Sequence, residues 1–232
     1  MAVMDHDIHR HWQGKSTFTT TMSSGQVNLA REHVRFRFPV FPQSLDVMDR
    51  VVENVNVRSS STVIIMRGLP GSGKTTMAAE LAYLSQRVYG RPTRICSADE
   101  YLYNAQGEYE WSRERVAAAH NCCFDEFKEA LDNNVFTVIV DNTNIRHGEY
   151  EQYATEAHAA GYCVVFVTFR CIGFNNALDF HDRTQRAIPR LQLQRRYEQY
   201  IREYRMNNVV VVEVDNQATQ NDLRDVHDYF VW

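Results

Sequence analysis

From residue 62 onward, short apolar runs alternate with longer stretches in which apolar residues recur at helical spacing. The short runs are rich in β-branched residues and predict buried strands. They cover residues 62–66, 94–97, 136–140, 163–169 and 209–214. Strands that alternate with helices favour a parallel sheet with helices on both of its faces. The predicted fold class is therefore α/β, with a five-stranded parallel sheet.

The stretches between these runs predict the helices that cover the sheet. Apolar residues recur every three or four positions in each of them, which is the helical period. Gly90 and Gly161 follow two of these helices, as expected of residues that end a helix. The remaining C-terminal residues predict only a weak helix. The predicted helices cover residues 74–89, 112–133, 149–160, 174–183 and 189–205.

The segment before residue 60 has a different pattern. Residues 1–30 are polar and include three histidines without a cysteine or a spaced acidic partner, so we predict a flexible tail rather than a metal site. Apolar and polar positions alternate over 34–40, which predicts a short edge strand. Helical spacing follows over 45–55. Because 57–61 has the composition of a linker, we predict two units, an N-terminal extension over 1–60 and the main domain over 61–232.

Composition and charge narrow the function classes. The net charge of −4 gives the whole chain no attraction to nucleic acid or anionic membrane, so a polyanion would need a local basic patch. The five cysteines are odd in number and form no CxxC pair, which favours a reducing, intracellular location, cytoplasmic or nuclear. No apolar run approaches the roughly 20 residues of a membrane span. We therefore expect no membrane partner, and the sequence does not identify a protein partner.

A phosphate-binding loop lies between the first strand and the first helix of the main domain. The pattern GxxxxGK[ST] needs glycines because the backbone curls around an anion with its N–H groups pointing inward. The next helix adds the positive end of its dipole. Lys74 is expected to contact the β- and γ-phosphates of ATP, and the Thr75 hydroxyl to bind Mg²⁺. The predicted cofactor-binding residues are Gly68, Gly71, Ser72, Gly73, Lys74, Thr75 and Thr76.

Acidic and amide residues follow two of the later strands. In a parallel sheet, residues just beyond the carboxyl ends of the strands face the ligand crevice. Asp99 is placed there to accept a proton from an attacking hydroxyl, although a helix cap is an equal alternative. Asp141 ends an apolar strand, as in a Walker B motif, and is predicted to lie near Mg²⁺. Asn142 and Asn144 either fix a turn or orient a substrate.

Arginines are concentrated between residues 183 and 205. A guanidinium fork matches the negative oxygens of a phosphoryl group in transfer. Arg183 and Arg186 precede Pro189 at a junction between two helices, where a mobile lid can carry them to the γ-phosphate. The later arginines read as a solvated helix face with pairs such as Glu198–Arg202, or as a local patch for a phosphate backbone.

Three ordered motifs together resemble a known family. They are the loop run that ends in Gly73-Lys74-Thr75, the segment Ser97-Ala98-Asp99-Glu100-Tyr101 and the segment Val140-Asp141-Asn142-Thr143-Asn144. The combination resembles the polynucleotide 5′-hydroxyl kinase group of P-loop kinases, which includes the phage-type end-repair kinases and the kinase-like domain of the myelin cyclic-nucleotide phosphodiesterase. The resemblance runs from about Thr62 to Asp215 and implies a P-loop NTPase fold of the kinase type.

The resemblance also implies an activity and roles for particular residues. It implies an ATP- and Mg²⁺-dependent kinase in which Lys74, Asp99, Arg183 and Arg186 are catalytic, Asp99 as the base toward the 5′-OH of a nucleic acid. It places Asn142 and Asn144 on the acceptor side. The phage enzymes carry an arginine where this chain has Leu102, which favours the alternative of a small-molecule kinase for a nucleoside, sugar or sugar nucleotide. A non-catalytic ATP-binding interaction module is a further alternative.

Overall fold

A parallel sheet of five strands forms the centre of the computed structural model, which describes residues 42–54, 61–104, 109–110, 112–184, 189–203 and 210–214. The strand order is β2-β3-β1-β4-β5, and every pairing is parallel. This sheet confirms the predicted fold class, a P-loop NTPase fold of the kinase type. The strands are β1 (Thr62–Arg67), β2 (Thr93–Cys96), β3 (Thr137–Val140), β4 (Cys163–Phe169) and β5 (Val210–Val214).

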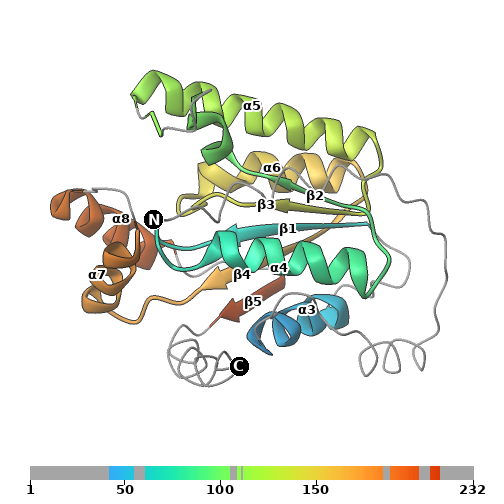
Figure 1. Cartoon of the computed structure of the whole chain (residues 1–232), viewed down its shortest axis with the longest axis horizontal. Helices are drawn as coiled ribbons and strands as arrows, with labels where there is room; N and C mark the ends of the chain where they lie inside the picture. The colour runs from blue at the N-terminus through green and yellow to red at the C-terminus, as the bar shows by residue number, and fades with distance from the viewer. Residues whose placement is uncertain are drawn as a thin grey trace, which may run out of the picture. The chain divides into compact units, whose positions relative to one another are not determined.

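Helices connect the strands and cover both faces of the sheet (Figure 1). The described helices are α3 (Pro42–Asn54), α4 (Lys74–Arg87), α5 (Arg113–Asp132), α6 (His147–Ala159), α7 (Phe174–Arg183), α8 (Arg190–Arg202) and the 3₁₀ helix η2 (Ala98–Leu102). Figure 1 shows α7 and α8 at the end of the sheet where β1 runs into the phosphate loop. That end carries every element of the candidate site.

The sheet buries alternate side chains of each strand on opposite faces, as the pleat requires. In β1, Ile64 and Met66 pack with α3 and α4, whereas Val63 and Ile65 pack with α5 and α6. All six residues of β1 are buried, so the central strand is covered on both faces. This explains why Val63–Met66 is a continuous apolar run rather than an alternating one.

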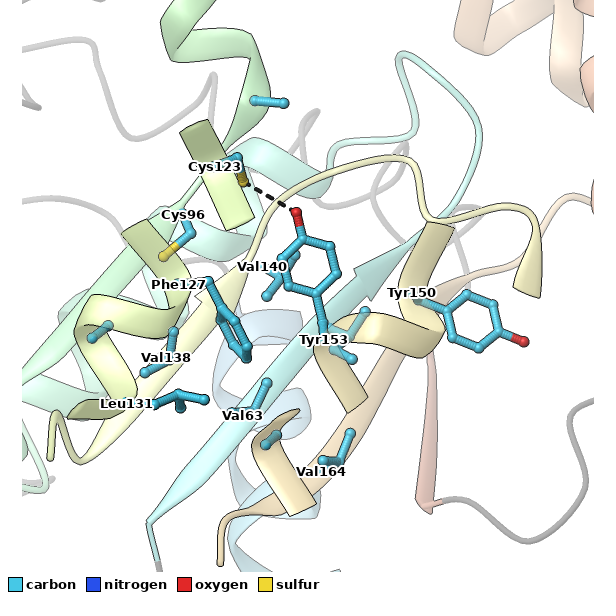
Figure 2. Close-up of a cluster of buried hydrophobic side chains, with 14 of the residues drawn as sticks. Val63, Cys96, Cys123, Phe127, Leu131, Val138, Val140, Tyr150, Tyr153 and Val164 are labelled. Carbon is cyan, nitrogen blue, oxygen red and sulfur yellow. Dashed lines mark hydrogen bonds between the residues drawn. The ribbon is translucent and has the colours of Figure 1, made fainter. Parts of the chain in front are cut away.

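The core on the α5–α6 face is rich in aromatic side chains. Phe127 of α5 and Tyr153 of α6 meet edge to face, with ring centroids 5.0 Å apart. Figure 2 shows the Tyr153 hydroxyl directed toward Cys123, and this O–H donates a hydrogen bond to the Cys123 sulfur at 3.5 Å. Burial raises the pKa of the Cys123 thiol, which therefore stays protonated and neutral at physiological pH.

The predicted elements from 62 to 203 are confirmed, with small shifts at their ends. Two matches are complete, β4 over 163–169 and α7 over 174–183. The helix predicted to begin at Glu149 instead begins at His147, because the Glu149 carboxylate accepts hydrogen bonds from the backbone N–H groups of Ile145 and Arg146. A carboxylate at this position satisfies N–H groups at the helix start and lets the helix begin earlier.

The helix expected over 45–55 is α3, and it packs against the main domain. Its buried residues Val47, Met48 and Val51 share one core with α4 and with β5. All described residues also belong to one compact unit, Arg35–Trp232. Among the described residues, the apolar face of α3 packs against side chains of the unit that contains the phosphate loop. The boundary proposed near residue 60 therefore does not separate α3 from that unit.

Some expectations lie outside the described residues. They are the polar tail over 1–30, the edge strand over 34–40, nearly all of the linker over 57–61 and the weak C-terminal helix. Within the part of the chain that the structure describes, no helix is long and apolar enough to cross a membrane.

Candidate active site

The phosphate loop leaves β1 at Gly68 and turns into α4 through three glycines. Gly71 and Gly73 have φ angles of 77° and 95°, a region that favours glycine. Gly68 is needed for space, because an added Cβ would lie 2.9 Å from both Phe169 Cβ and Ser72 Oγ. The glycines of the motif are therefore required by the backbone path itself, as the sequence predicted.

Lys74 lies over this loop. Its ammonium donates a hydrogen bond to the Leu69 carbonyl at 2.8 Å and lies 3.5 Å from Ser72 Oγ. The side chain is only 7% exposed, so the charge is held at the loop rather than in solvent. Thr75 and Thr76 follow in the first turn of α4 and are exposed. N–H groups in a first helical turn have no acceptor within the helix and attract anions.

The two predicted carboxylates lie at the ends of neighbouring strands. Asp99 is in η2, just beyond β2, and is half-buried; Asp141 directly follows β3 and is 4% exposed. The Ser97 hydroxyl donates to the Asp141 carbonyl at 3.1 Å, and the Asp141 N–H donates to the Cys96 carbonyl at 2.9 Å. These bonds hold the Asp99 and Asp141 segments together at the same edge of the sheet.

The amide turn that follows Asp141 connects this pair to the phosphate loop. Asn142 Oδ1 accepts the Ala98 N–H at 3.0 Å, and its Nδ2 donates to the Cys123 sulfur at 3.5 Å. Asn144 donates through Nδ2 to the Met66 carbonyl at 2.8 Å and has a φ of 47°. The Thr143 carbonyl accepts the Gly68 N–H at 3.0 Å. The turn therefore joins η2, β1 and the loop.

These contacts favour one of the two predicted roles for Asn142 and Asn144. Both side chains bond to the protein's own groups, and their exposures are 9% and 1%. A side chain as covered as Asn144 is not available to an acceptor in this arrangement. The geometry therefore supports the turn-fixing alternative, in which the two asparagines hold the backbone of the site in place through hydrogen bonds.

Helix α7 places Arg183 beside the phosphate loop. A Cβ added to Gly71 would lie 1.8 Å from the Phe180 carbonyl oxygen and 2.8 Å from Thr184 Cγ2, so the end of α7 rests directly on the loop. Arg183 is the last residue of α7 and is exposed, with its guanidinium carbon 5.7 Å from the centroid of the Phe180 ring. The predicted partner Arg186 lies outside the described residues.

The arginines of α8 match the solvated helix face that the sequence predicted. Arg190, Arg195 and Arg202 are exposed. The expected pair joins Arg202 to Glu198 at 3.8 Å, one turn apart on the helix. An exposed pair of this kind contributes at most about 1 kcal/mol.

A buried arginine that the sequence did not single out lies directly before the loop. Arg67 ends β1 with none of its surface exposed. Its Nη2 donates to the carbonyls of Ile145 at 3.2 Å and Glu203 at 2.6 Å, and its guanidinium carbon lies 5.2 Å from the centroid of the Tyr200 ring. Arg67 therefore links the start of the phosphate loop to the end of α8. A charge directly after an apolar run was the only available signal.

Leu102, the last residue of η2, is part of the core. Leu102 is 3% exposed and packs among the aromatic side chains of the α5–α6 face. Its neighbours Tyr101 and Tyr103 are instead exposed, at 39% and 43%. A charged side chain at residue 102 would have to leave this core.

The loop fits a polyphosphate and its metal in two respects. The glycines leave the backbone free to approach an anion, and the buried ammonium of Lys74 supplies a fixed positive charge. The Thr75 hydroxyl and the Asp141 carboxylate are oxygen ligands of the type that Mg²⁺ prefers. No group of three or more His, Cys, Asp or Glu side chains that could hold a metal occurs among the described residues.

The fold and the site together define the class, a protein with a kinase-type P-loop fold. Residues 63–172 match a family model described as an AAA domain. The chain is 31% identical to human NEDD4-binding protein 2 over 105 residues, which cover 45% of this chain and 6% of that protein. It is 29% identical to human YLP motif-containing protein 1 over 123 residues, covering 45% of this chain and 6% of that protein.

The chain thus covers only a small part of the length of these curated relatives. Among solved structures, it is similar to a gluconokinase from Sinorhizobium meliloti 1021, with 17% sequence identity and a TM-score of 0.46. That similarity covers 73% of this chain and 96% of the gluconokinase.

Proposed function

We propose that this chain is an ATP-dependent kinase that transfers the γ-phosphate to a hydroxyl, with the 5′-OH of a nucleic acid as the acceptor. One observation carries the proposal. Hydrogen bonds from Ser97 to Asp141, from Ala98 to Asn142 and from Gly68 to Thr143 join the base, metal and phosphate segments at one edge of the sheet. An intracellular location, cytoplasmic or nuclear, is part of the same proposal, since the five cysteines are free thiols.

The phosphate loop would hold ATP and Mg²⁺. The loop N–H groups and the Lys74 ammonium bind the phosphates, and Thr75 with Asp141 forms the protein part of the metal shell. Bound Mg²⁺ neutralises charge on the β- and γ-phosphates. Lys74 lies over the loop with its ammonium on the Leu69 carbonyl, and phosphate oxygens would replace that carbonyl as its acceptor.

Asp99 would act on the acceptor. Its carboxylate takes the proton of the acceptor hydroxyl while the hydroxyl oxygen forms a bond to the γ-phosphorus. The bond between that phosphorus and the oxygen bridging to the β-phosphate breaks, so ADP leaves with the electron pair. Arg183 would stabilise the charge on the transferred oxygens, since α7 rests on the loop at Gly71.

A small-molecule acceptor is the second candidate, and the buried Leu102 favours it. The phage-type enzymes hold the acceptor phosphate with an arginine at this position, and a core leucine cannot do so. A nucleoside or sugar without that phosphate does not require the arginine. The two candidates share Lys74, Thr75, Asp99 and Asp141, and they differ only in the acceptor.

One experiment tests the activity and separates the acceptors. The protein is incubated with γ-labelled ATP and Mg²⁺ against 5′-OH RNA, 5′-OH DNA, nucleosides and sugars. Oligonucleotides that already carry a 5′-phosphate are the matched negative controls. Transfer to the 5′-OH oligonucleotides alone supports the proposal, whereas transfer to nucleosides or sugars alone supports the second candidate. Absence of transfer to every acceptor would contradict both.

Two substitutions assign the activity to the site. We expect Lys74→Ala to lose ATP binding while the fold is kept, because the ammonium serves the loop. Asp99→Asn should lose about 10²–10⁴-fold in kcat, the usual contribution of a positioned base, with little change in ATP affinity. Calorimetric ATP titrations and initial rates measure both effects. Rates in Asp99→Asn equal to those of the parent would remove Asp99 from the mechanism.

A further inference from the structure

The segment that carries Asp99 is held against helix α5 by the carboxylate of Glu126. Glu126 Oε2 accepts a hydrogen bond from the Tyr101 hydroxyl at 2.9 Å. Its other oxygen, Oε1, accepts from Arg94 Nη1 at 3.0 Å. Arg94 precedes Asp99 in the chain, on β2, and Tyr101 follows it within η2. One carboxylate of α5 therefore contacts the chain on both sides of Asp99.

The surroundings of Glu126 strengthen these two contacts. Its side chain is only 15% exposed, and the Arg94 guanidinium lies against it as an ion pair. Burial and the Glu126 carboxylate raise the pKa of the Tyr101 hydroxyl, which therefore stays protonated and able to donate at physiological pH. A hydrogen bond to a carboxylate is stronger than one between neutral groups. The contact between Tyr101 and Glu126 is therefore a strong side-chain link between η2 and α5.

The internal hydrogen bonding of η2 is weak by comparison. The bond from the Glu100 N–H to the Ser97 carbonyl measures 3.4 Å. Ordinary N–H···O bonds are shorter, at roughly 2.7–3.2 Å. Hydrogen bonds in a 3₁₀ helix also have poorer geometry than those in an α-helix. The orientation of residues in η2, including Asp99, therefore depends on the contacts that other elements make with this short helix.

Contacts to the turn after β3, to the core and to α5 hold η2 from outside. The Ser97 hydroxyl and the Ala98 N–H donate to the turn. At the other end of η2, Leu102 is 3% exposed and packs in the core of the α5–α6 face. Tyr101 lies between these two ends. Its hydrogen bond to Glu126 therefore fixes the part of η2 that directly follows the candidate base.

We propose that Glu126 is a positioning residue for the reaction, because its carboxylate fixes the segment on which Asp99 meets the acceptor hydroxyl. The inference rests on the proposed function and adds a residue of α5 that acts through Asp99 rather than on the acceptor. A misplacement of about 1 Å in a reacting group can cost about 10²-fold in rate. The two hydrogen bonds of Glu126 set the position of this segment before the acceptor binds.

Variants of this contact test the role in catalysis. Glu126→Ala removes both hydrogen bonds, and Tyr101→Phe removes only the hydroxyl. We expect Glu126→Ala to lower kcat by about 10- to 100-fold because the base is misplaced, with ATP affinity unchanged because ATP is held by the phosphate loop. Asp125→Asn is the matched control, since this neighbouring carboxylate of α5 pairs with Lys128 of the same helix at 2.9 Å. The control should keep the parent rate. Initial rates with the best acceptor and calorimetric ATP titrations measure these effects.

Double variants show whether Glu126 acts through Asp99. In Asp99→Asn no base is left to position, so the addition of Glu126→Ala should not lower the residual kcat further. A general structural role would instead lower the rate by the same factor in both backgrounds. Adding Tyr101→Phe to Glu126→Ala should likewise cause no further loss, because the hydrogen bond is already absent.

Hydrogen exchange of η2 gives a readout that does not depend on activity. We expect the amides of residues 97–102 to exchange faster in Glu126→Ala and in Tyr101→Phe than in the parent, because η2 opens more often. Asp125→Asn should match the parent. Thermal unfolding shows whether each variant is folded, and Tyr101→Phe preserves the test if Glu126→Ala is unstable.

The outcomes separate this inference from the proposed function. Where the parent transfers phosphate, a parent-like kcat in Glu126→Ala, or an equal loss in the Asp99→Asn background, would overturn the positioning role. Unchanged exchange over residues 97–102 would overturn it as well. If the parent transfers phosphate to no acceptor, the kinase proposal fails, whereas faster exchange in Glu126→Ala would still support Glu126 as the residue that holds η2.

Discussion

Arg183 is the residue whose role depends most on its immediate surroundings. It follows directly on the part of α7 that rests on Gly71, and its side chain is exposed rather than tied into the core. An arginine in such a place can either reach a transferred phosphoryl group or remain in solvent. Arg196, on α8, is a half-buried arginine that we place outside the catalytic site.

Replacing Arg183 by lysine distinguishes these roles, because lysine keeps the charge and loses the two-pronged fork. If the fork stabilises the transition state, Arg183→Lys should lower kcat by on the order of 10²-fold while the KM for ATP changes little. Arg196→Lys should behave like the parent. Steady-state rates of the two variants are measured side by side with the best acceptor. If both rates are close to that of the parent, Arg183 is an ordinary solvent-exposed arginine without a catalytic role.

The residues of the site differed in how far the sequence could identify them. Lys74, Asp99 and Asp141 were predicted because a motif or a strand end fixes where such residues lie. Arg67 was missed because its partners, the carbonyls of Ile145 and Glu203, are far away in the chain and become neighbours only after folding. An arginine that is buried because it bonds to distant backbone carbonyls cannot be recognised from its neighbours in the sequence.

At the scale of elements, the phosphate loop and α7 lie so close together at Gly71 that no Cβ fits between them. Gly71 combines a left-handed backbone with a Phe180 carbonyl at a distance that excludes any Cβ. Gly161, after α6, has a similar φ of 80°, but an added Cβ there meets nothing within 4 Å. Alanine substitutions at Gly71 and Gly161 therefore distinguish the effect of backbone strain from the effect of losing the contact with α7.

We expect Gly71→Ala and Gly161→Ala to share one defect and differ in another. Both should lose roughly 1–2 kcal/mol of unfolding free energy, the cost of a left-handed residue with a Cβ. Only Gly71→Ala should also weaken ATP binding, by at least about tenfold or about 1.4 kcal/mol, because α7 must move off the loop. Chemical denaturation and calorimetry measure the two effects. Parent-like ATP affinity in Gly71→Ala would mean that α7 can separate from the loop without consequence.

The elements themselves were largely predictable, whereas their order was not. Runs such as 163–169 are rich in β-branched and aromatic residues, and so short an apolar segment favours a strand over a helix. Alternation of strand and helix indicated parallel pairing. The order β2-β3-β1-β4-β5 joins strands that are far apart in the chain, so no local pattern could indicate it.

At the scale of the whole molecule, α3 belongs to the same packed unit as the phosphate loop. A change in composition over 57–61 suggested a boundary, and the apolar stripe of α3 indicated only that the helix needs a partner. The structure supplies that partner in the core shared with α4 and β5. Composition marks a change in local pattern, but it does not show whether the chain folds back across that point.

A substitution in α3 should therefore destabilise the entire described unit. Met48 is 3% exposed, and Met48→Ala is expected to lower the unfolding free energy by about 2–5 kcal/mol. Glu53→Ala, on the exposed side of the same helix, should have little effect. Thermal unfolding followed by circular dichroism and by ATP protection should show one transition shifted downward. Two separate transitions, with only the first shifted, would instead favour an independent extension.

The central place of β1 also bears on how the chain folds while it is being synthesised. Thr62 of β1 pairs with Thr137 of β3 and with Cys163 of β4, so both neighbours of this strand leave the ribosome long after it. Contacts between such distant segments slow folding and leave apolar strands exposed in the meantime. The nascent loop also lacks the Thr143 carbonyl that anchors Gly68. A nucleotide can therefore stabilise the chain only late in its synthesis, after β3 and the turn that carries Thr143 have been made.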